Sequence, residues 1–279
     1  MELAVFWKRA IVGKVMEFEI VHEAPHYVVV HKPAGMLTHP SKPEQGLTLW
    51  DHLKRALACD LQEPGRQISF INRLDRETSG LVLAALTSRA ARAFGLAMQS
   101  RLIHKEYLAL VRGWPAEERW TVDASLDAQR RHEDYIVQLR QIAHPAGYPA
   151  RTEFAVEARF TRGSERFALV RAWPHTGRLH QIRVHLSLGG HPVVGDKLYG
   201  PPPAEALYLE FIETDWTPAL ESRLLLRSHA LHSAVLGWGT IRLPDENEPD
   251  GGSEVIPAAE YRLGVPPEWD AWHRDAVEP

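Results

Sequence analysis

The sequence has a single cysteine, Cys59, among its 279 residues. One thiol can form neither an intrachain disulfide nor a thiolate cluster for zinc. No apolar run approaches the ~20 residues of a membrane-spanning helix. The N-terminal stretch MELAVFWKRAIVGKV is too short and too interrupted by charge for a secretory signal. These absences favour a cytoplasmic protein.

Loops that bind nucleotides are also missing, since no GxGxxG follows a strand and no GxxxxGK[ST] occurs. His175, His180 and His185 recur five residues apart, a spacing that turns successive side chains to different faces of a helix. No HExxH motif or nearby carboxylate completes a zinc site. We therefore expect neither a bound nucleotide nor a metal ion.

The net charge of −4 is unevenly distributed. Residues 73–112 and 151–183 each hold seven lysines and arginines against three acids, a balance of +4. Residues 244–279 hold ten acids and two bases, a balance of −8. This separation is consistent with a local anion-binding face, and equally with the solvated faces of amphipathic elements.

In the N-terminal half, residues 18–21 and 27–31 are typical of two strands parted by a turn. The apolar run LVLAAL at 81–86 predicts a buried strand. Thr87 or Ser88 can cap a following helix, whose apolar residues recur at helical spacing. Residues 106–113 then indicate another strand.

In the C-terminal half, residues 151–160 alternate so that Thr152, Phe154, Val156, Ala158 and Phe160 share one face. This segment and RFALVRAW predict an antiparallel hairpin. In LHQIRVHLSLGG, the spacing of Leu179, Ile182 and Leu186 predicts a helix that ends at Gly189–Gly190. Strands in hairpins, mixed with short helices, predict an α+β fold with a mainly antiparallel sheet.

Asp75 is the carboxylate with the most unusual surroundings, because an arginine stands on either side of it in Arg73-Leu74-Asp75-Arg76. A carboxylate held among guanidinium groups stays ionised and can act as a nucleophile or stabilise charge. A loop ion pair worth ~0–1 kcal/mol explains the same residues. The segment HTGRLHQIR is likewise open to two interpretations: a phosphate-binding turn in front of a helix, or a capped helix with a polar face.

The combination of motifs is more specific than any one of them. NRLDRETSGL at 72–81, KEY at 105–107, HTGRLHQIRVHL at 175–186 and GHPVVGDKLYG at 190–200 follow one another along the chain. Together they closely resemble the RluA-type pseudouridine synthases. VHKPAG at 30–35 looks like that family's first motif, so the resemblance extends over about residues 18–243.

The resemblance implies a pseudouridine synthase fold with two half-domains and a central active-site cleft. It also implies an isomerase that converts specific uridines of ribosomal or transfer RNA to pseudouridine without a metal or organic cofactor. The target uridine would be flipped out of a stem-loop, because its reacting atoms are shielded in a stacked strand. The protein would be a cytoplasmic monomer.

Seven residues acquire roles from the resemblance. Asp75 would be the nucleophile, Arg183 would pair with it and keep it ionised, and Tyr107 would stack on the uracil. Arg73 would fill the space left by the flipped nucleotide. The residues expected to contact phosphates or base edges are Lys32, Arg178 and His180.

The sequence departs from the family's pattern at two positions. Asn72 stands where many relatives have His, and Leu179 stands where Thr is more usual. Only about 17 residues precede the first strand, too few for the small RNA-binding domain that many relatives carry. We therefore expect an N-terminal extension at 1–17, a catalytic domain at 18–243 and an acidic tail at 244–279.

Two other functions fit part of the pattern. A non-catalytic RNA-binding protein with the same fold would have no need of Asp75, Tyr107 and Arg183 together. A carboxylate-dependent glycosidase would need a second acid within ~5–10 Å of Asp75, and Glu77 is the only acid close to it in sequence.

Overall fold

The computed structural model describes residues 18–40, 47–58, 60–135, 137–201, 204–244 and 254–269. The expected N-terminal extension, Cys59 and much of the expected acidic tail lie outside these residues. The chain divides into two compact units. The first comprises residues 1–104 and 236–262, and the second comprises residues 105–235 and 263–279.

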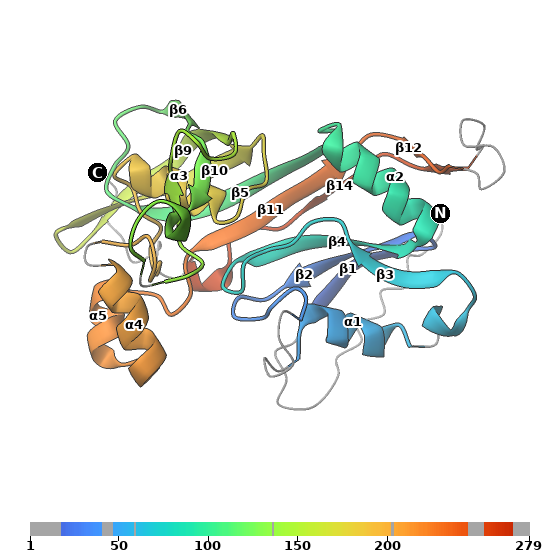
Figure 1. The fold of residues 1–279 in the computed structure, drawn as a ribbon, viewed down its shortest axis with the longest axis horizontal. Helices are drawn as coiled ribbons and strands as arrows, with labels where there is room; N and C mark the ends of the chain where they lie inside the picture. The colour runs from blue at the N-terminus through green and yellow to red at the C-terminus, as the bar shows by residue number, and fades with distance from the viewer. Residues whose placement is uncertain are drawn as a thin grey trace. The chain divides into compact units, whose positions relative to one another are not determined.

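The first unit is built on antiparallel strands, which include the three predicted at 18–21, 27–31 and 81–86 (Figure 1). Strand β1 (Glu19–Ala24) forms a hairpin with β2 (Tyr27–Lys32), and β2 pairs in turn with β4 (Ser79–Thr87). Strand β3 (Arg66–Phe70) also pairs with β4. The six residues of LVLAAL lie within β4 and are all buried, as predicted.

Helices α1 (Leu49–Ala56) and α2 (Ser88–Gln99) and a short 3-10 helix, η1 (Asp60–Gln62), complete the N-terminal part of this unit. Thr87 is the N-cap of α2, because its hydroxyl accepts a hydrogen bond from the Ala90 amide at 3.2 Å. Helix α2 packs against β4, and Phe94 meets Trp238 edge-on at 5.1 Å between ring centroids. The predicted cap and apolar face are confirmed.

The chain passes between the two units inside β11 (Leu231–Trp238), a strand whose eight residues are all buried. Three short strands follow: β12 (Ile241–Arg242), β13 (Val255–Ile256) and β14 (Ala259–Arg262). β13 pairs with β12, and β14 pairs with β11. Part of the expected acidic tail is therefore folded, and the Tyr261 hydroxyl lies 3.0 Å from that of Tyr27.

The second unit has the strand order β5 (Ile103–Arg112), β10 (Glu165–Pro174), β9 (Arg151–Arg162) and β6 (Arg119–Asp123). The predicted β9–β10 hairpin is confirmed. A separate small hairpin joins β7 (Leu126–Ala128) and β8 (Gln141–Ala143), with a 3-10 helix, η2 (Gln129–Arg131), after β7.

The prediction that five alternating residues of β9 share one face is wrong, because the strand contains a β-bulge. Val156 pairs with Val170 and Ala158 with Leu169, so Glu157 is an extra residue on β9. The extra residue reverses the alternation. Phe154 therefore lies on one face, stacked on Trp120 at 5.0 Å, and Phe160 on the other, stacked on Phe167 at 5.9 Å.

Three helices belong to the second unit: α3 (Gln181–Leu188), α4 (Ala204–Thr214) and α5 (Pro218–Leu224). Gly189 ends α3 as predicted. The predicted apolar position at Leu179 is wrong, since Leu179 precedes the helix and is 48% exposed. Residues 181–186 are instead all buried, polar ones included, so the first six residues of α3 are enclosed by the rest of the chain.

All strand pairings described residue by residue are antiparallel, and helices are fewer than strands, which confirms the predicted α+β class. The cleft expected between half-domains stays a prediction. Within the described residues, every helix is too short or too polar to cross a membrane.

Candidate active site

Asp75 lies in the loop between β3 and β4 of the first unit, and it is half-buried. Asn72 fixes the start of this loop. Its amide nitrogen donates to the Leu81 carbonyl at 3.1 Å, and its oxygen accepts from the Leu83 amide at 2.8 Å. Asn72, which departs from the family's pattern, is therefore buried and binds strand β4 through both the nitrogen and the oxygen of its side-chain amide.

The residues after β2 hold the middle of the loop. The Thr38 hydroxyl donates to the Leu74 carbonyl at 3.0 Å and accepts from the Leu74 amide at 3.3 Å. The Gly35 amide donates to the Arg76 carbonyl at 2.8 Å. Both neighbours of Asp75 are thus tied to the segment 35–38 through the backbone.

Lys32, the last residue of β2, is fully buried under the same loop. Its ammonium group donates to the carbonyls of Pro33 at 2.9 Å, Met36 at 2.8 Å and Arg76 at 3.1 Å. Burial lowers the pKa of Lys32 to about 7, and the negative charge of Asp75 opposes that shift. With all three hydrogens directed at carbonyl oxygens, Lys32 holds the loop and places a cation near Asp75.

This burial predicts an alkaline loss of activity. Below about pH 7 the Lys32 ammonium donates three hydrogen bonds, and above it the neutral amine donates only two. We expect kcat to fall about fivefold on the alkaline side, the equivalent of one hydrogen bond that positions Asp75. Single-turnover rates measured from pH 6 to pH 9 test this.

Lys32→Met is the control, because methionine fills the space and does not titrate. We expect it to lower kcat at every pH and to flatten the alkaline decline. An unchanged decline in Lys32→Met would assign the titration to another group.

The arginines on either side of Asp75 are both exposed. The Arg76 side chain donates through Nε to the Gly35 carbonyl at 3.0 Å. Arg73 has no carboxylate partner among the residues that the structure describes, so its guanidinium remains available to a ligand.

The other two expected catalytic residues lie in the second unit. Tyr107 is on β5, opposite Ala172 of β10, and is 8% exposed. Arg183 is on α3 and donates to Asp196 through two bonds, Nε to Oδ2 at 2.7 Å and Nη2 to Oδ1 at 2.9 Å. The expected pairing of Arg183 with Asp75 stays a prediction.

Asp196, the partner of Arg183, was not singled out from the sequence, although it lies within GHPVVGDKLYG. It is completely buried, and its Oδ1 also accepts from the amides of Leu198 and Tyr199. Burial alone would raise the pKa of Asp196, but the charge and hydrogen bonds of Arg183 hold it well below its usual range. The Arg183–Asp196 pair is therefore ionised and rigid.

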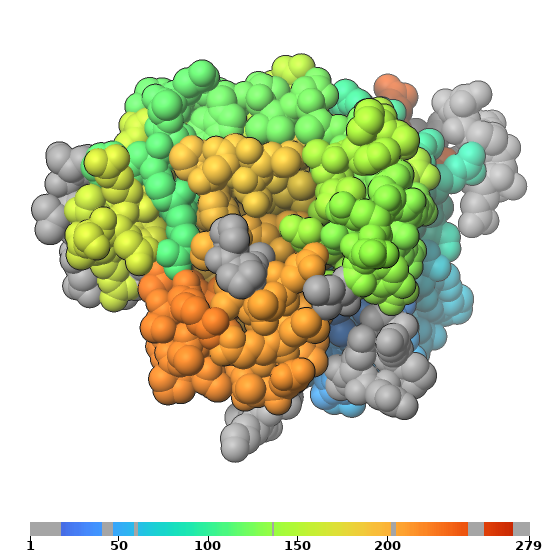
Figure 2. Space-filling view, turned by 60° about the vertical axis from the view of Figure 1, so that its left-hand side comes forward, coloured from blue at the N-terminus to red at the C-terminus, as the bar shows by residue number. Residues whose placement is uncertain are grey.

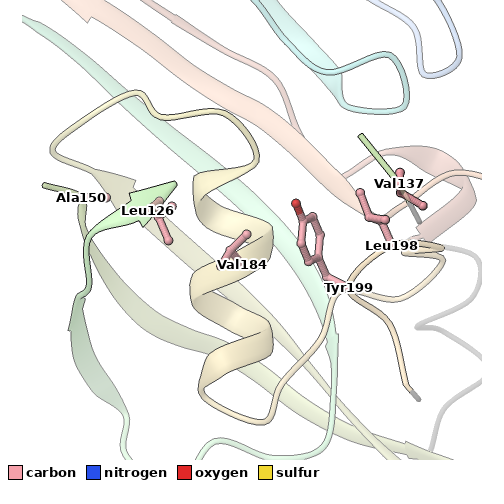
Figure 3. Packing of buried hydrophobic residues seen from close by; sticks show 6 residues of the cluster. All are labelled: Leu126, Val137, Ala150, Val184, Leu198 and Tyr199. Carbon is pink, nitrogen blue, oxygen red and sulfur yellow. The ribbon is translucent and has the colours of Figure 1, made fainter. Parts of the chain in front are cut away.

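The ring of Tyr199 packs against the Arg183 side of this ion pair. The Arg183 guanidinium lies 4.9 Å from the centre of its ring, and its hydroxyl lies 2.8 Å from Nδ1 of His180. Tyr199 packs among buried residues of several elements, and Val184 of α3 points toward it (Figure 3). The structure thus brings two of the predicted residues, His180 and Arg183, to the same tyrosine.

Gln181 organises the turn before α3. Its side-chain oxygen accepts from the Thr176 hydroxyl at 2.7 Å and from the Arg178 amide at 3.0 Å. Its amide nitrogen donates to the Arg151 carbonyl at 3.0 Å. The Arg178 amide is therefore used within the protein, which leaves the exposed Arg178 guanidinium as the group that can meet a ligand.

The three evenly spaced histidines go to different partners. His175 lies 3.0 Å from Glu153, His180 contacts Tyr199, and His185 contacts the Thr152 hydroxyl at 2.9 Å. Burial lowers the pKa of His185, which favours its neutral form. In the described ranges, no three His, Cys, Asp or Glu side chains gather as metal ligands would.

Comparison with known proteins agrees with the motifs around these residues. Residues 26–188 match the family model described as RNA pseudouridylate synthase. The chain belongs to this family. The matched range includes Lys32, the Asp75 loop, Tyr107 and Arg183, and it ends with helix α3.

Two curated relatives cover different shares of the chain. The dual-specificity RNA pseudouridine synthase RluA of Vibrio vulnificus is 34% identical over 65% of this chain and 68% of its own length. The ribosomal large subunit pseudouridine synthase D of Nitrosomonas europaea is 31% identical over 84% of this chain and 64% of its own.

A solved structure shares the fold. Human RNA pseudouridylate synthase domain containing 4 aligns with 93% of this chain and 94% of its own, with a TM-score of 0.65 and 23% identity. The pseudouridine synthase fold expected from the sequence is confirmed.

Proposed function

We propose that this protein is an isomerase that converts uridine in RNA to pseudouridine. The observation that carries the proposal is the loop of Asp75, a half-buried carboxylate with an arginine on each side. The backbone of that loop is bound to Lys32 and Thr38, and the Asn72 side chain binds it to β4, in a chain that belongs to the pseudouridylate synthase family. These hydrogen bonds hold the Asp75 carboxylate in a fixed place, as nucleophilic catalysis requires.

In the proposed reaction, Asp75 assists the cleavage of the glycosidic bond between uracil N1 and the ribose. The detached uracil rotates, its C5 forms the new bond to ribose C1′, the C5 proton is lost to solvent through a base in the site, and N1 takes up a proton from solvent. Atoms are conserved, since substrate and product are isomers. Tyr107 stacks on the uracil, and Arg183 keeps the Asp75 carboxylate ionised.

The remaining predicted residues divide between binding and positioning. Arg73 enters the space left by the flipped nucleotide, and its lack of a carboxylate partner in the described residues supports that role. Arg178 contacts the RNA backbone or a base. His180 acts through Tyr199, and the burial of Lys32 supports a positioning role rather than direct contact with phosphate.

We assign the substrate to ribosomal or transfer RNA, in a stem-loop where an unpaired uridine can be flipped out. The names of the two relatives, one ribosomal and one dual-specific, support this class. We further propose a cytoplasmic monomer that needs no metal. Residues 18–243 would form its catalytic domain, with an extension at 1–17 and an acidic tail at 244–279.

Pseudouridine mapping tests the function directly. Total RNA from the source organism is mapped with and without the gene, and the purified protein is then incubated with the RNA that changes. We expect one or a few uridines to lose modification on deletion and to regain it in vitro. A purified protein that binds RNA but modifies none of the candidates would indicate a non-catalytic RNA-binding protein.

A further inference from the structure

We propose that Tyr148 and Arg178 form a stacking ledge for an unpaired base of the RNA substrate. The inference rests on the proposed function, because it takes RNA as the ligand. It adds a binding site for a nucleotide other than the target uridine. Both residues belong to the second unit.

Tyr148 presents its ring to solvent from a fixed backbone. The residue is 57% exposed, while its neighbour Ala150 is 1% exposed. Its amide and carbonyl both bond to Leu126 of β7, at 2.9 and 3.0 Å. Gly147 lies so close to Leu126 that a Cβ atom would come within 2.6 Å of its backbone. The aromatic surface is therefore preorganised, which lowers the entropic cost of binding.

Arg178 lies against this ring with its charge uncompensated. Its guanidinium is 5.4 Å from the centre of the Tyr148 ring, and its Nε donates to the Pro149 carbonyl at 3.1 Å. Among the described residues no carboxylate pairs with Arg178, whereas Arg151 and Arg171 each bind two acids. A fixed cation beside an exposed aromatic ring suits a base and its phosphate.

Other arginines of this unit also lie over aromatic rings, but those rings are less exposed. Arg119 covers Trp173 at 5.3 Å, and Arg166 covers Trp114 at 4.7 Å. Both tryptophans are only half-exposed. The Tyr148–Arg178 pair combines an uncompensated cation with a mostly exposed ring.

The ledge is joined rigidly to the predicted catalytic residues of its unit. The Arg178 amide bonds to Gln181, the first residue of α3, and Arg183 lies two residues further along that helix. Beside it, Gly177 has no atom within 4 Å of its Cβ position, and Leu179 is 48% exposed. The β7–β8 region stands out in yellow-green on the right-hand side of the space-filling view (Figure 2). An extended strand bound at α3 thus finds open space and apolar surface next to the ring.

Fluorescence of a base analogue tests the ledge without depending on catalysis. The probe is an oligouridylate of about 15 nucleotides with one 2-aminopurine, a base whose fluorescence falls when it stacks. Wild type and Tyr148→Phe should quench it and bind with affinities within about twofold of each other. Tyr148→Leu should weaken binding about tenfold and remove the quenching, since stacking on an aromatic ring is lost.

Tyr135→Leu is the matched control. Tyr135 is 49% exposed, but no arginine lies over its ring in the described residues. We expect this variant to bind and quench like the wild type. Arg178→Gln should weaken binding and reduce the salt slope by about one charge, while Tyr148→Leu should leave the slope unchanged.

Unchanged affinity and quenching in Tyr148→Leu would overturn the ledge, as would an equal loss in Tyr135→Leu. If the Tyr148 ring binds a protein partner instead of RNA, Tyr148→Leu should bind and quench the probe like the wild type. These outcomes are independent of pseudouridine formation, because mapping decides the proposed function separately.

Discussion

Asp75→Asn is expected to abolish pseudouridine formation, with a rate loss on the order of 10⁴-fold or more, as is typical when a nucleophile is removed. Asparagine has nearly the same shape as aspartate but cannot attack carbon as a carboxylate does. RNA affinity should stay within a few-fold of wild type, since the arginines of the loop remain. Tritium release from RNA labelled at uridine C5 measures turnover, and gel shift measures binding.

Glu77→Gln is the matched control, two residues along the same loop. We expect its activity to stay within a few-fold of wild type, because no role in the reaction falls on Glu77. Substantial turnover by Asp75→Asn would refute the nucleophile assignment. A deep loss in Glu77→Gln would revive the two-carboxylate mechanism of a glycosidase, in which a second acid is essential.

Arg183→Ala is expected to lower activity by at least two orders of magnitude and to destabilise the fold by about 3–5 kcal/mol. The second effect follows from Asp196, which is completely buried and would lose its only salt-bridge partner within the described residues. A buried carboxylate without a cation disrupts its surroundings, including the amides of Leu198 and Tyr199 that it binds. Urea unfolding and single-turnover rates separate the two effects.

Arg171→Ala provides the comparison, because Arg171 also pairs with carboxylates, those of Glu106 and Glu157, but all three side chains are partly exposed. Ion pairs that water reaches contribute less than buried ones, about 0–1 kcal/mol at the surface, so less stability should be lost than in Arg183→Ala. Arg183→Lys keeps the charge but not the two parallel bonds. If Arg183→Lys folds stably yet remains slow, the geometry of Arg183 is what catalysis requires. If both Arg183 variants were as active as the wild type, the assigned role would be wrong.

Local signals predicted much of the fold. The β1–β2 hairpin, the buried strand LVLAAL, the Thr87 cap and the Gly189 stop each depend on a few neighbouring residues, and all are confirmed. The bulge at Glu157 escaped prediction, since Glu157 falls on the polar side of the alternation predicted for β9. Pairing with β10 sets the register there, and pairing is not a local property.

The site residues that lie in the family's sequence motifs could be predicted. Asp75, Tyr107 and Arg183 were found because their segments recur in a known family. Asp196 was missed because the sequence around it is typical of a turn. Its ion-pair partner, Arg183, lies 13 residues earlier in the chain, on helix α3. The role of Lys32 was hidden for a similar reason: three backbone carbonyls have no signature in a sequence.

The bulge at Glu157 gives β9 one residue whose removal leaves the others in place. Without Glu157, Val156 would still lie opposite Val170 and Ala158 opposite Leu169, so Phe154 and Phe160 would keep their faces. Removing a residue elsewhere in β9 would instead shift its neighbours by one position, either toward the bulge or toward the end of the strand, and turn them to the opposite face. A deletion scan of β9 should therefore be best tolerated at Glu157, because only there does the loss of one residue leave the same side chains hidden from water.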